Sequence, residues 1–342
     1  MTQRNRQTNC NEGRTVPSFF LFRMDAIKPV GKNLSAIQAI QVEELRAPVQ
    51  GSERHFRYWS WWLLLFVVIW TAAYFRLAQD PVDLFKRNWV FIPVGFCGAI
   101  LGNISAVGGG IVFIPVLIFL FHLPPVTSLK IALASQSWGM TSGALGWIQK
   151  RVVPLRALKL TVPGLLIGSS ISSLVIHPSA LLVKLLFGPV SILLGVLTLV
   201  LSRKAVRSAT ASEIPAKAAA PLFLTALVGG LITGWIAIGE GEVVAALLML
   251  IYRVNVAASI GLGVVLLSIN SIFLTLLHNL LLGGIPWNIA AFTGFGCVFG
   301  ARLAPYLSRR SNPMVLKTIF AIVAICDGIL FIVQYLVMHR GN

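Results

Sequence analysis

The stretch that decides the fold reads Gly98-Ala-Ile-Leu-Gly102-Asn-Ile-Ser-Ala-Val-Gly108-Gly109-Gly110-Ile-Val-Phe-Ile-Pro115. It is apolar on both sides of three consecutive glycines, and a glycine in a helix interior costs roughly 1 kcal/mol relative to alanine. We therefore expect one helix to end before the glycines and another to begin after them. Irregular backbone at membrane depth is tolerated only where it is buried in protein or lines a cavity. The stretch thus predicts a broken helix inside a membrane protein.

A second break of the same kind follows about 130 residues later. It reads Gly230-Leu-Ile-Thr-Gly234-Trp-Ile-Ala-Ile-Gly239-Glu240-Gly241-Glu242, so that Gly234 matches Gly102 and Gly239 matches Gly108. Paired, glycine-interrupted segments in corresponding positions of two halves are the sequence feature that best marks the binding site of a secondary transporter. The two breaks therefore predict a transporter built from two repeats.

Composition favours a polytopic membrane protein. Of the 342 residues, 56% are hydrophobic and 11% are charged. The mean hydropathy is +0.83, a value typical of membrane proteins rather than of soluble domains. The net charge of +17 comes from a tail and from short connections, which a positive-inside bias explains better than nucleic-acid binding does. The four cysteines have no metal-site spacing and imply no disulfide framework. We expect no cofactor, no metal site and no nucleic-acid partner.

The apolar runs predict the domain organisation. A membrane span needs roughly 20 apolar residues. Tyr58–Phe75 is the first candidate, and two sets of five runs follow it in matching order. Repeats with an odd number of crossings must be inverted relative to each other. The runs Ile111–Leu123 and Val243–Tyr252 are too short to cross a bilayer, so we interpret them as half-helices or re-entrant segments.

The predicted fold is therefore all-α: two inverted repeats of about five helical segments with glycine-broken half-helices, plus one extra N-terminal transmembrane helix. The predicted segments are a polar, basic, disordered cytoplasmic tail at 1–57, the extra helix at 58–76, the first repeat at 89–202, a basic cytoplasmic linker at 203–218 and the second repeat at 219–338.

The distribution of Lys and Arg predicts the orientation. The connections at His177-Pro-Ser and Gly283-Gly-Ile-Pro lack both residue types, whereas Lys150–Lys159, Arg253 and the Arg203–Lys217 loop are basic. The positive-inside rule puts the basic connections and the tail in the cytoplasm and the other two connections outside. We expect an integral, multi-pass protein of the bacterial inner (cell) membrane with a cytoplasmic N-terminus.

Backbone and polar side chains near the breaks are the predicted anion ligands. A helix that begins after a glycine break presents free N–H groups and a positive dipole end, which form an anion site without a cation. Polar clusters also interrupt the apolar runs about 30 residues after each break, and either neighbouring helices or an oxyanion can satisfy them. The predicted substrate-binding residues are Asn103, Ser105, Gly108, Gly109, Gly110, Ser135, Gln136, Ser137, Gly239, Gly241, Ser268, Asn270 and Ser271.

Three carboxylates lie in the predicted membrane region: Glu240, Glu242 and Asp327. An intramembrane carboxylate is costly enough to suggest a function. Glu240 and Glu242 have three interpretations: proton carriers, ligands of a cation, or solvated residues at the membrane surface. Asp327 is a further proton-relay candidate, or it packs against a neighbouring polar group. Lys130 either extends to the membrane surface or faces the pathway, and His278 lies near a predicted helix end, where a polar group costs little.

Several motifs occur in the order and spacing of a known family. They are the break Gly102–Pro115, the helix Pro163-Gly-Leu-Leu-Ile-Gly168, the second break, and Gly294-Phe-Gly296-Cys-Val-Phe-Gly300-Ala-Arg302-Leu-Ala. On these residues the chain from about Val90 to Val337 resembles the sulfite exporter TauE/SafE family, also called the toluene-sulfonate uptake permease family. The resemblance implies a two-repeat permease for small, often sulfur-containing anions, and points to Gly108, Gly109, Gly110 and Pro115. The second half departs from the family pattern at Glu240, Glu242 and Ala246.

We therefore expect a secondary transporter of a small anion, either a sulfur oxyanion or an organosulfonate or carboxylate, that works by alternating access with a proton or an ion as the coupling species. The expected partners are this anion, the coupling ion and the lipid bilayer. The sequence contains none of the hydrolase, metalloprotease or nucleotide-binding motifs, so we expect no enzyme. The alternatives are a cation transporter or channel that uses Glu240 and Glu242, and a non-transporting membrane scaffold protein.

Overall fold

The computed structural model describes residues 52–105, 108–149, 151–177, 179–204, 215–310 and 313–340. Every element in this part of the chain is a helix, which confirms the predicted all-α fold. Residues 1–51 of the predicted disordered tail lie outside the described residues. The predicted extra helix is part of α2 (Ser52–Leu77), which begins six residues earlier than expected. A short helix, α3 (Pro81–Asn88), follows it.

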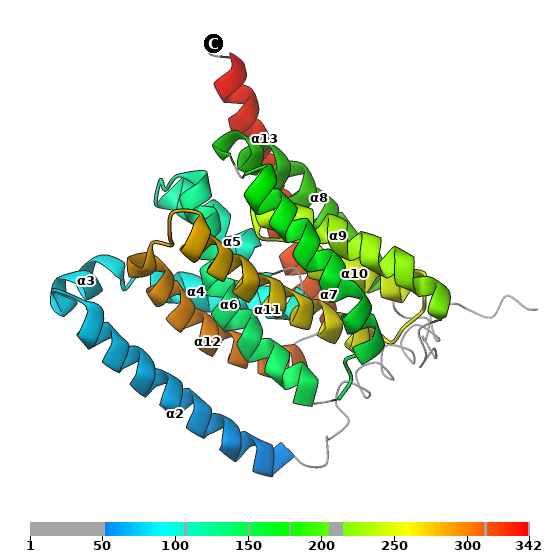
Figure 1. Ribbon diagram of the computed structural model, residues 1–342, viewed down its shortest axis with the longest axis horizontal. Coiled ribbons are helices and arrows are strands. Elements are labelled where there is room, and N and C mark those ends of the chain that lie inside the picture. The colour runs from blue at the N-terminus through cyan, green and yellow to red at the C-terminus, as the bar shows by residue number, and fades with distance from the viewer. Residues whose placement is uncertain are drawn as a thin grey trace, which may run out of the picture.

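Two sets of helices follow in the same order (Figure 1). The first set is α4 (Phe91–Ser105), α5 (Gly110–Pro115) with the π-helical turn η1 (Val116–Leu120), α6 (Pro125–Gln149), α7 (Leu155–Ser170) with the π-helical turn η2 (Ile171–Val175), and α8 (Ala180–Lys204). The second set is the 3₁₀ turn η3 (Ala216–Ala218), α9 (Ala219–Ile236), α10 (Glu240–Leu250), α11 (Val256–Leu281), α12 (Trp287–Arg310) and α13 (Pro313–Arg340). The two predicted half-helices are α5 with η1, and α10.

Several helices have the length and composition of membrane spans. In the described part of the chain five helical segments are long and apolar enough to cross a bilayer, or six if the bent pair α2 and α3 counts as one span. Their outward faces are apolar: Leu193 on α8 is 62% exposed and Leu224 on α9 is 58% exposed. Such faces are unfavourable in water but match lipid tails. The chain is therefore an integral, multi-pass membrane protein.

In each set the first helix packs against the fourth helix of the other set, and we call these two packings the exchanged contacts. Helix α4 packs along α12 of the second set, and α9 packs along α7 of the first set. The remaining long helices pair between the sets as α6 with α11 and α8 with α13. A two-fold exchange of equivalent helices would produce this pattern, so the packing is consistent with the two predicted repeats.

Matched glycines make the two exchanged contacts possible. On α7, Gly164 and Gly168 lie against the backbone of α9, where a methyl group on Gly168 would come within 2.9 Å of the Leu227 carbonyl carbon. On α12, Gly296 and Gly300 lie against α4 in the same way, and a methyl group on Gly300 would come within 2.9 Å of the Phe96 carbonyl carbon. Small residues allow helix backbones to approach closely in a membrane. These equivalent contacts hold the two halves together.

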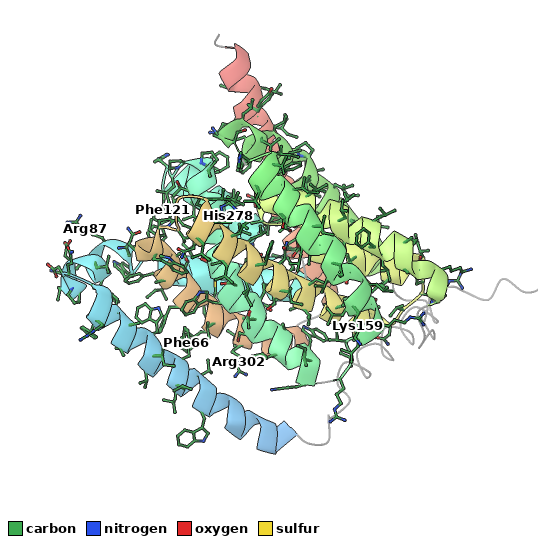
Figure 2. The ribbon with its side chains drawn as sticks, in the orientation of Figure 1. Phe66, Arg87, Phe121, Lys159, His278 and Arg302 are labelled. Atoms are coloured by element: carbon green, nitrogen blue, oxygen red, sulfur yellow. The ribbon has the colours of Figure 1, made fainter. Side chains whose placement is uncertain are left out.

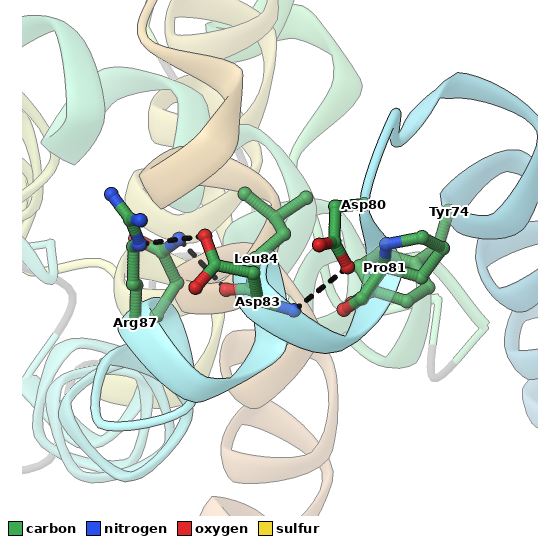
Figure 3. Close-up of polar contacts among 7 residues, drawn as sticks. Tyr74, Asp80, Pro81, Asp83, Leu84 and Arg87 are labelled. Atoms are coloured by element: carbon green, nitrogen blue, oxygen red, sulfur yellow. Dashed lines mark hydrogen bonds and ion pairs between the residues drawn. The ribbon is translucent and has the colours of Figure 1, made fainter.

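The N-terminal helix α2 is attached to the second set through aromatic rings. Trp70 lies with its ring centroid 4.6 Å from that of Phe295 on α12, and its indole N–H donates to the Ala291 carbonyl at 3.2 Å. Figure 3 shows the turn that follows α2. There the Asp80 carboxylate caps α3 by accepting the Asp83 N–H at 3.1 Å. The cap satisfies one of the donors that a helix start leaves unpaired.

The glycine contacts give a stability prediction. Replacement of Gly168 by Ala would force a methyl group into the α9 backbone, so we expect the variant to unfold at a lower temperature or not to fold. The matched control is Gly146→Ala on α6, because a methyl group there meets no atom within 4 Å. Alanine is more favourable than glycine in a helix interior by roughly 1 kcal/mol, so we expect this control to be at least as stable as the wild type. Thermal unfolding of the purified proteins in detergent measures both. Equal or higher stability of Gly168→Ala would contradict the close contact.

Candidate functional site

The two breaks have the same backbone conformation. Gly108 has φ of 101° and Gly239 has φ of 103°, in the left-handed region that residues with a side chain rarely adopt. Helix α5 begins directly after the first break and α10 directly after the second, and no side chain of the described residues caps either helix start. The first N–H groups of both helices therefore lack the side-chain acceptor that usually satisfies them.

Glycine also allows the two breaks to meet in the interior. A methyl group on Gly102 would come within 2.7 Å of the Gly109 nitrogen, so the end of α4 lies directly on the first break. A methyl group on Gly110 would come within 2.8 Å of the Ile238 side chain in the second break. Gly108, Gly109 and Gly110 are all buried. The two segments that are far apart in sequence thus form one structural unit.

Gln136 on α6 connects the two breaks. Its Nε2 donates to the Ala237 carbonyl in the second break at 2.7 Å. Its Oε1 points at the first break, where it lies 2.9 Å from the position that a methyl group on Gly108 would occupy. This Oε1 atom is buried and has no hydrogen-bond partner among the described residues. Gln136 therefore has a bound donor and an unused acceptor at the centre of the site.

The other predicted residues of the first half vary in their surroundings. Asn103 is buried and donates to the Ala99 carbonyl of its own helix at 2.9 Å, while its Oδ1 has no partner among the described residues. Ser135 pairs with Thr293 of α12 at 2.5 Å, and Ser137 donates to the Ala134 carbonyl at 2.7 Å. Ser135 and Ser137 thus have protein partners. The side chain of Ser105 lies outside the described residues.

Glu240 and Asn270 form a buried network behind the second break. Glu240 is the first residue of α10 and is fully buried. Its Oε2 accepts a hydrogen bond from Asn270 Nδ2 of α11, and Asn270 Oδ1 accepts one from Ser169 of α7 at 2.7 Å. The nearby Thr233 hydroxyl donates to the Ile238 carbonyl at 3.1 Å, and Glu240 Oε1 has no partner among the described residues. The network joins three helices around one carboxylate.

Glu242 and Asp327 lie in different surroundings. The Glu242 carboxylate is buried and contacts the hydroxyl of Thr198 on α8, so neither Glu240 nor Glu242 is a solvated surface residue. Asp327 is half-buried on α13, which packs mainly against α8. The breaks therefore bring together Glu240, Glu242 and the glycines, whereas Asp327 belongs to another helix pair.

The remaining cluster residues lie on α11. The Ser268 hydroxyl pairs with Thr141 of α6 at 2.8 Å, and Ser271 is buried without a hydrogen-bond partner in the described part of the chain. Gly241 is buried next to Glu240. Sequence reasoning missed the partners Thr141, Ser169 and Thr198. Thr198 is a single hydroxyl residue in an apolar run, and no local pattern marks it. Ser169 belongs to the cluster Ser169-Ser170-Ile-Ser172-Ser173 and Thr141 adjoins Ser142, so the signal that could have found them is a polar cluster in an apolar run.

Comparison with known families agrees with the resemblance seen in the sequence. The family model described as sulfite exporter TauE/SafE matches residues 90–331, which covers all the helices that form the two breaks. No individual curated protein and no solved structure matches the chain.

Gln136 gives a test of the bridge between the breaks. In Gln136→Leu the buried Ala237 carbonyl loses its donor, and an unsatisfied buried group costs about 1–3 kcal/mol. We expect a lower unfolding temperature in detergent. Ser137→Ala is the control, because Ser137 is half-buried and bonds only within its own helix turn among the contacts described. If both variants unfold at the same temperature, Gln136 does not hold the breaks together.

Proposed function

Because the chain belongs to the sulfite exporter TauE/SafE family, we propose that it is a secondary transporter that moves a small sulfur oxyanion or organosulfonate across the membrane by alternating access. The family consists of membrane permeases for sulfite and related sulfur anions, and it matches most of this chain. Enzymatic activity is not a property of such permeases. The observation that carries the proposal is the meeting of two broken helices, because transporters bind their substrates at such breaks.

The first break is the better anion site of the two. No described side chain hydrogen-bonds to the start of α5, which adds the positive end of a helix dipole. No carboxylate lies in this break. Among the predicted side-chain ligands, Gln136 borders the break through an amide whose Oε1 is unused. The Nε2 of that amide has two N–H donors and uses one for the Ala237 carbonyl, so the other is the donor for an oxyanion.

The second break is the better proton site. Glu240 occupies the position equivalent to Gly109, so the first residue of α10 carries a carboxylate where the first break has a glycine. A buried ion costs several kcal/mol after relaxation unless it is paired, and Glu240 has no cationic partner among the described residues. Binding of a proton removes this cost and supplies a donor from Glu240 Oε1. The asymmetry between the breaks therefore supports co-movement of an anion and a proton.

The cation alternative is supported less well. Glu240 and Glu242 are two residues apart on α10, and residues at that spacing do not share a helix face. Their contacts agree with this, because Glu240 bonds to α11 and Glu242 contacts α8. Two carboxylates that diverge in this way do not form a common cation site.

Flux measurements test both parts of the proposal. We expect the wild-type protein in proteoliposomes to take up labelled sulfite, sulfate or thiosulfate, and a pH gradient to increase the flux. Glu240→Gln keeps the volume but cannot release a proton, so it should lose the gradient-dependent part by about tenfold or more, a factor that corresponds to 1.4 kcal/mol. Asp83→Asn is the control, because Asp83 is an exposed partner of Arg87 far from the breaks in sequence.

Two results would contradict the proposal. Absence of flux for every oxyanion, with protein shown to be folded, would exclude anion transport and favour the cation or scaffold alternatives. Full gradient dependence in both Glu240→Gln and Glu242→Gln would exclude these carboxylates as proton carriers.

Gly109 provides a test of the anion site alone. A larger side chain at this position would collide with the Phe113 ring, which lies within 2.8 Å of a methyl group there, and would cover the helix start. We expect Gly109→Leu to insert into the membrane but to lose at least 90% of the flux, since about 1.4 kcal/mol of lost binding already gives a tenfold effect. Gly146→Leu is the matched control. Normal flux in Gly109→Leu would exclude the first break as the site.

A further inference from the structure

A stripe of polar residues runs along α11 away from the breaks. Ser268, Ser271, Thr275 and His278 are spaced by three, four and three residues, which places them on one face of the helix. All four are at most 7% exposed. At 1.5 Å per residue the stripe extends roughly 15 Å from Ser268 to His278. It therefore leads from the centre of the protein toward the C-terminal end of α11.

Helix α6 faces this stripe with polar residues of its own. Two contacts fix the alignment: Thr141 pairs with Ser268 at 2.8 Å, and the Lys130 ammonium donates to the Leu282 carbonyl at 2.5 Å. The residue numbers fall on α6 as they rise on α11, so the two helices are antiparallel. Ser137 lies between Lys130 and Thr141 on α6. Across the interface between α6 and α11, the hydroxyl groups of Thr141 and Ser268 meet directly, and Lys130 lies at its outer end.

His278 has an unusual environment at this end. Its side chain is 1% exposed, and neither Nδ1 nor Nε2 has a hydrogen-bond partner among the described residues. A neutral imidazole carries one N–H donor, and a buried donor without an acceptor is costly. Lys130 reaches the same end of α11, because its Nζ donates to the carbonyl of Leu282, four residues after His278. The Lys130 ammonium has three N–H donors and uses one of them for Leu282.

The position of this pair agrees with the predicted outer surface. The turn after α11 contains Gly283 and Gly284, which belong to a connection without Lys or Arg. In Figure 2, His278 lies in the upper part of the view, whereas Lys159 and Arg302 lie in the lower part. Lys159 belongs to the predicted cytoplasmic connections. His278 and Lys130 are therefore at the opposite, predicted outer end.

We propose that Lys130 and His278 form a second binding site for the transported oxyanion, at the outer end of the α6–α11 interface, and that the hydroxyl stripe connects it to the glycine breaks. The site presents two kinds of donor, an ammonium and an imidazole N–H, and no described residue accepts a hydrogen bond from the imidazole. A small oxyanion supplies that acceptor and a negative charge beside the Lys130 ammonium. Capping of the α11 C-terminus explains Lys130 alone but leaves His278 unpaired. The identity of the ligand rests on the proposed function.

Nuclear magnetic resonance of the imidazole nitrogens tests the site directly. The full-length protein, with its five histidines labelled with ¹⁵N, is titrated in detergent micelles with sodium sulfite and with sodium sulfate, against sodium chloride at equal ionic strength. His278→Leu identifies the His278 signals, and His278→Phe serves if the first variant does not fold. The exposed His122 and His177 report unspecific effects of the ions.

We expect the His278 signals to shift saturably with sulfite or sulfate. In Lys130→Gln the half-saturating concentration should rise by about tenfold or more, which corresponds to 1.4 kcal/mol. Lys130→Arg keeps the charge and should retain the shift, which also covers failure of Lys130→Gln to fold. Lys184→Gln is the matched control, because Lys184 is a lysine in an apolar helix of the same half. We expect it to leave the titration unchanged.

The outcomes separate the two proposals when the flux of the same protein is measured in proteoliposomes. If the His278 signals do not move while the protein transports the anion, the outer site is wrong and the transport proposal stands. If the signals shift and no flux is found, the outer site stands and the transport proposal is wrong. An equal shift in the wild type and in Lys130→Gln would overturn the assignment of the site to this pair.

Discussion

The hydrogen bond from Gln136 to the Ala237 carbonyl is the contact on which the arrangement of the site depends. It fixes one break against the other through a side chain of a third helix. The bond is possible because Gly108 and Gly110 leave room for the amide, which would collide with a methyl group on either residue. A buried amide that lacked this partner would be costly. Gly108, Gly110 and Gln136 therefore form a single packing unit, because the amide can reach Ala237 only where both of these residues are glycines.

The two halves use this common framework for different chemistry. Equivalent glycines, Gly108 and Gly239, have nearly the same φ, and equivalent helix pairs make the exchanged contacts. The side chains that follow the two glycines differ, because the first break has bare backbone and the second has Glu240. A symmetric scaffold thus holds an asymmetric site. Such a difference supports two different ligands, an anion and a proton, within one pair of breaks.

Sequence reasoning predicted those features that depend on local chemistry. Glycine breaks, apolar lengths and the spacing between matched residues are visible in the chain itself, and the all-helical fold followed from them. Partners in space were not visible. Asn270 is a predicted substrate ligand, and its bonds to Glu240 and Ser169 on two other helices are not visible in the sequence. The bond from Lys130 to the Leu282 carbonyl likewise joins two residues 152 positions apart, which no local pattern indicates. The N-terminal helix begins earlier than its apolar run, because polar residues 52–57 continue the same helix.

The exchange of helices has a consequence for biosynthesis. Helix α4, and α2 before it, pack against α12, which is made nearly last. Roughly 200 residues separate α4 from α12, so at 5–20 residues per second α4 waits about 10 to 40 s for its partner. During that interval α4 can pack against α5 and α6, but the face that α12 covers in the finished protein stays open. A chain whose synthesis stops before α12 therefore leaves α4 and α2 without the helix that covers them in the finished protein, although α7 has already paired with α9.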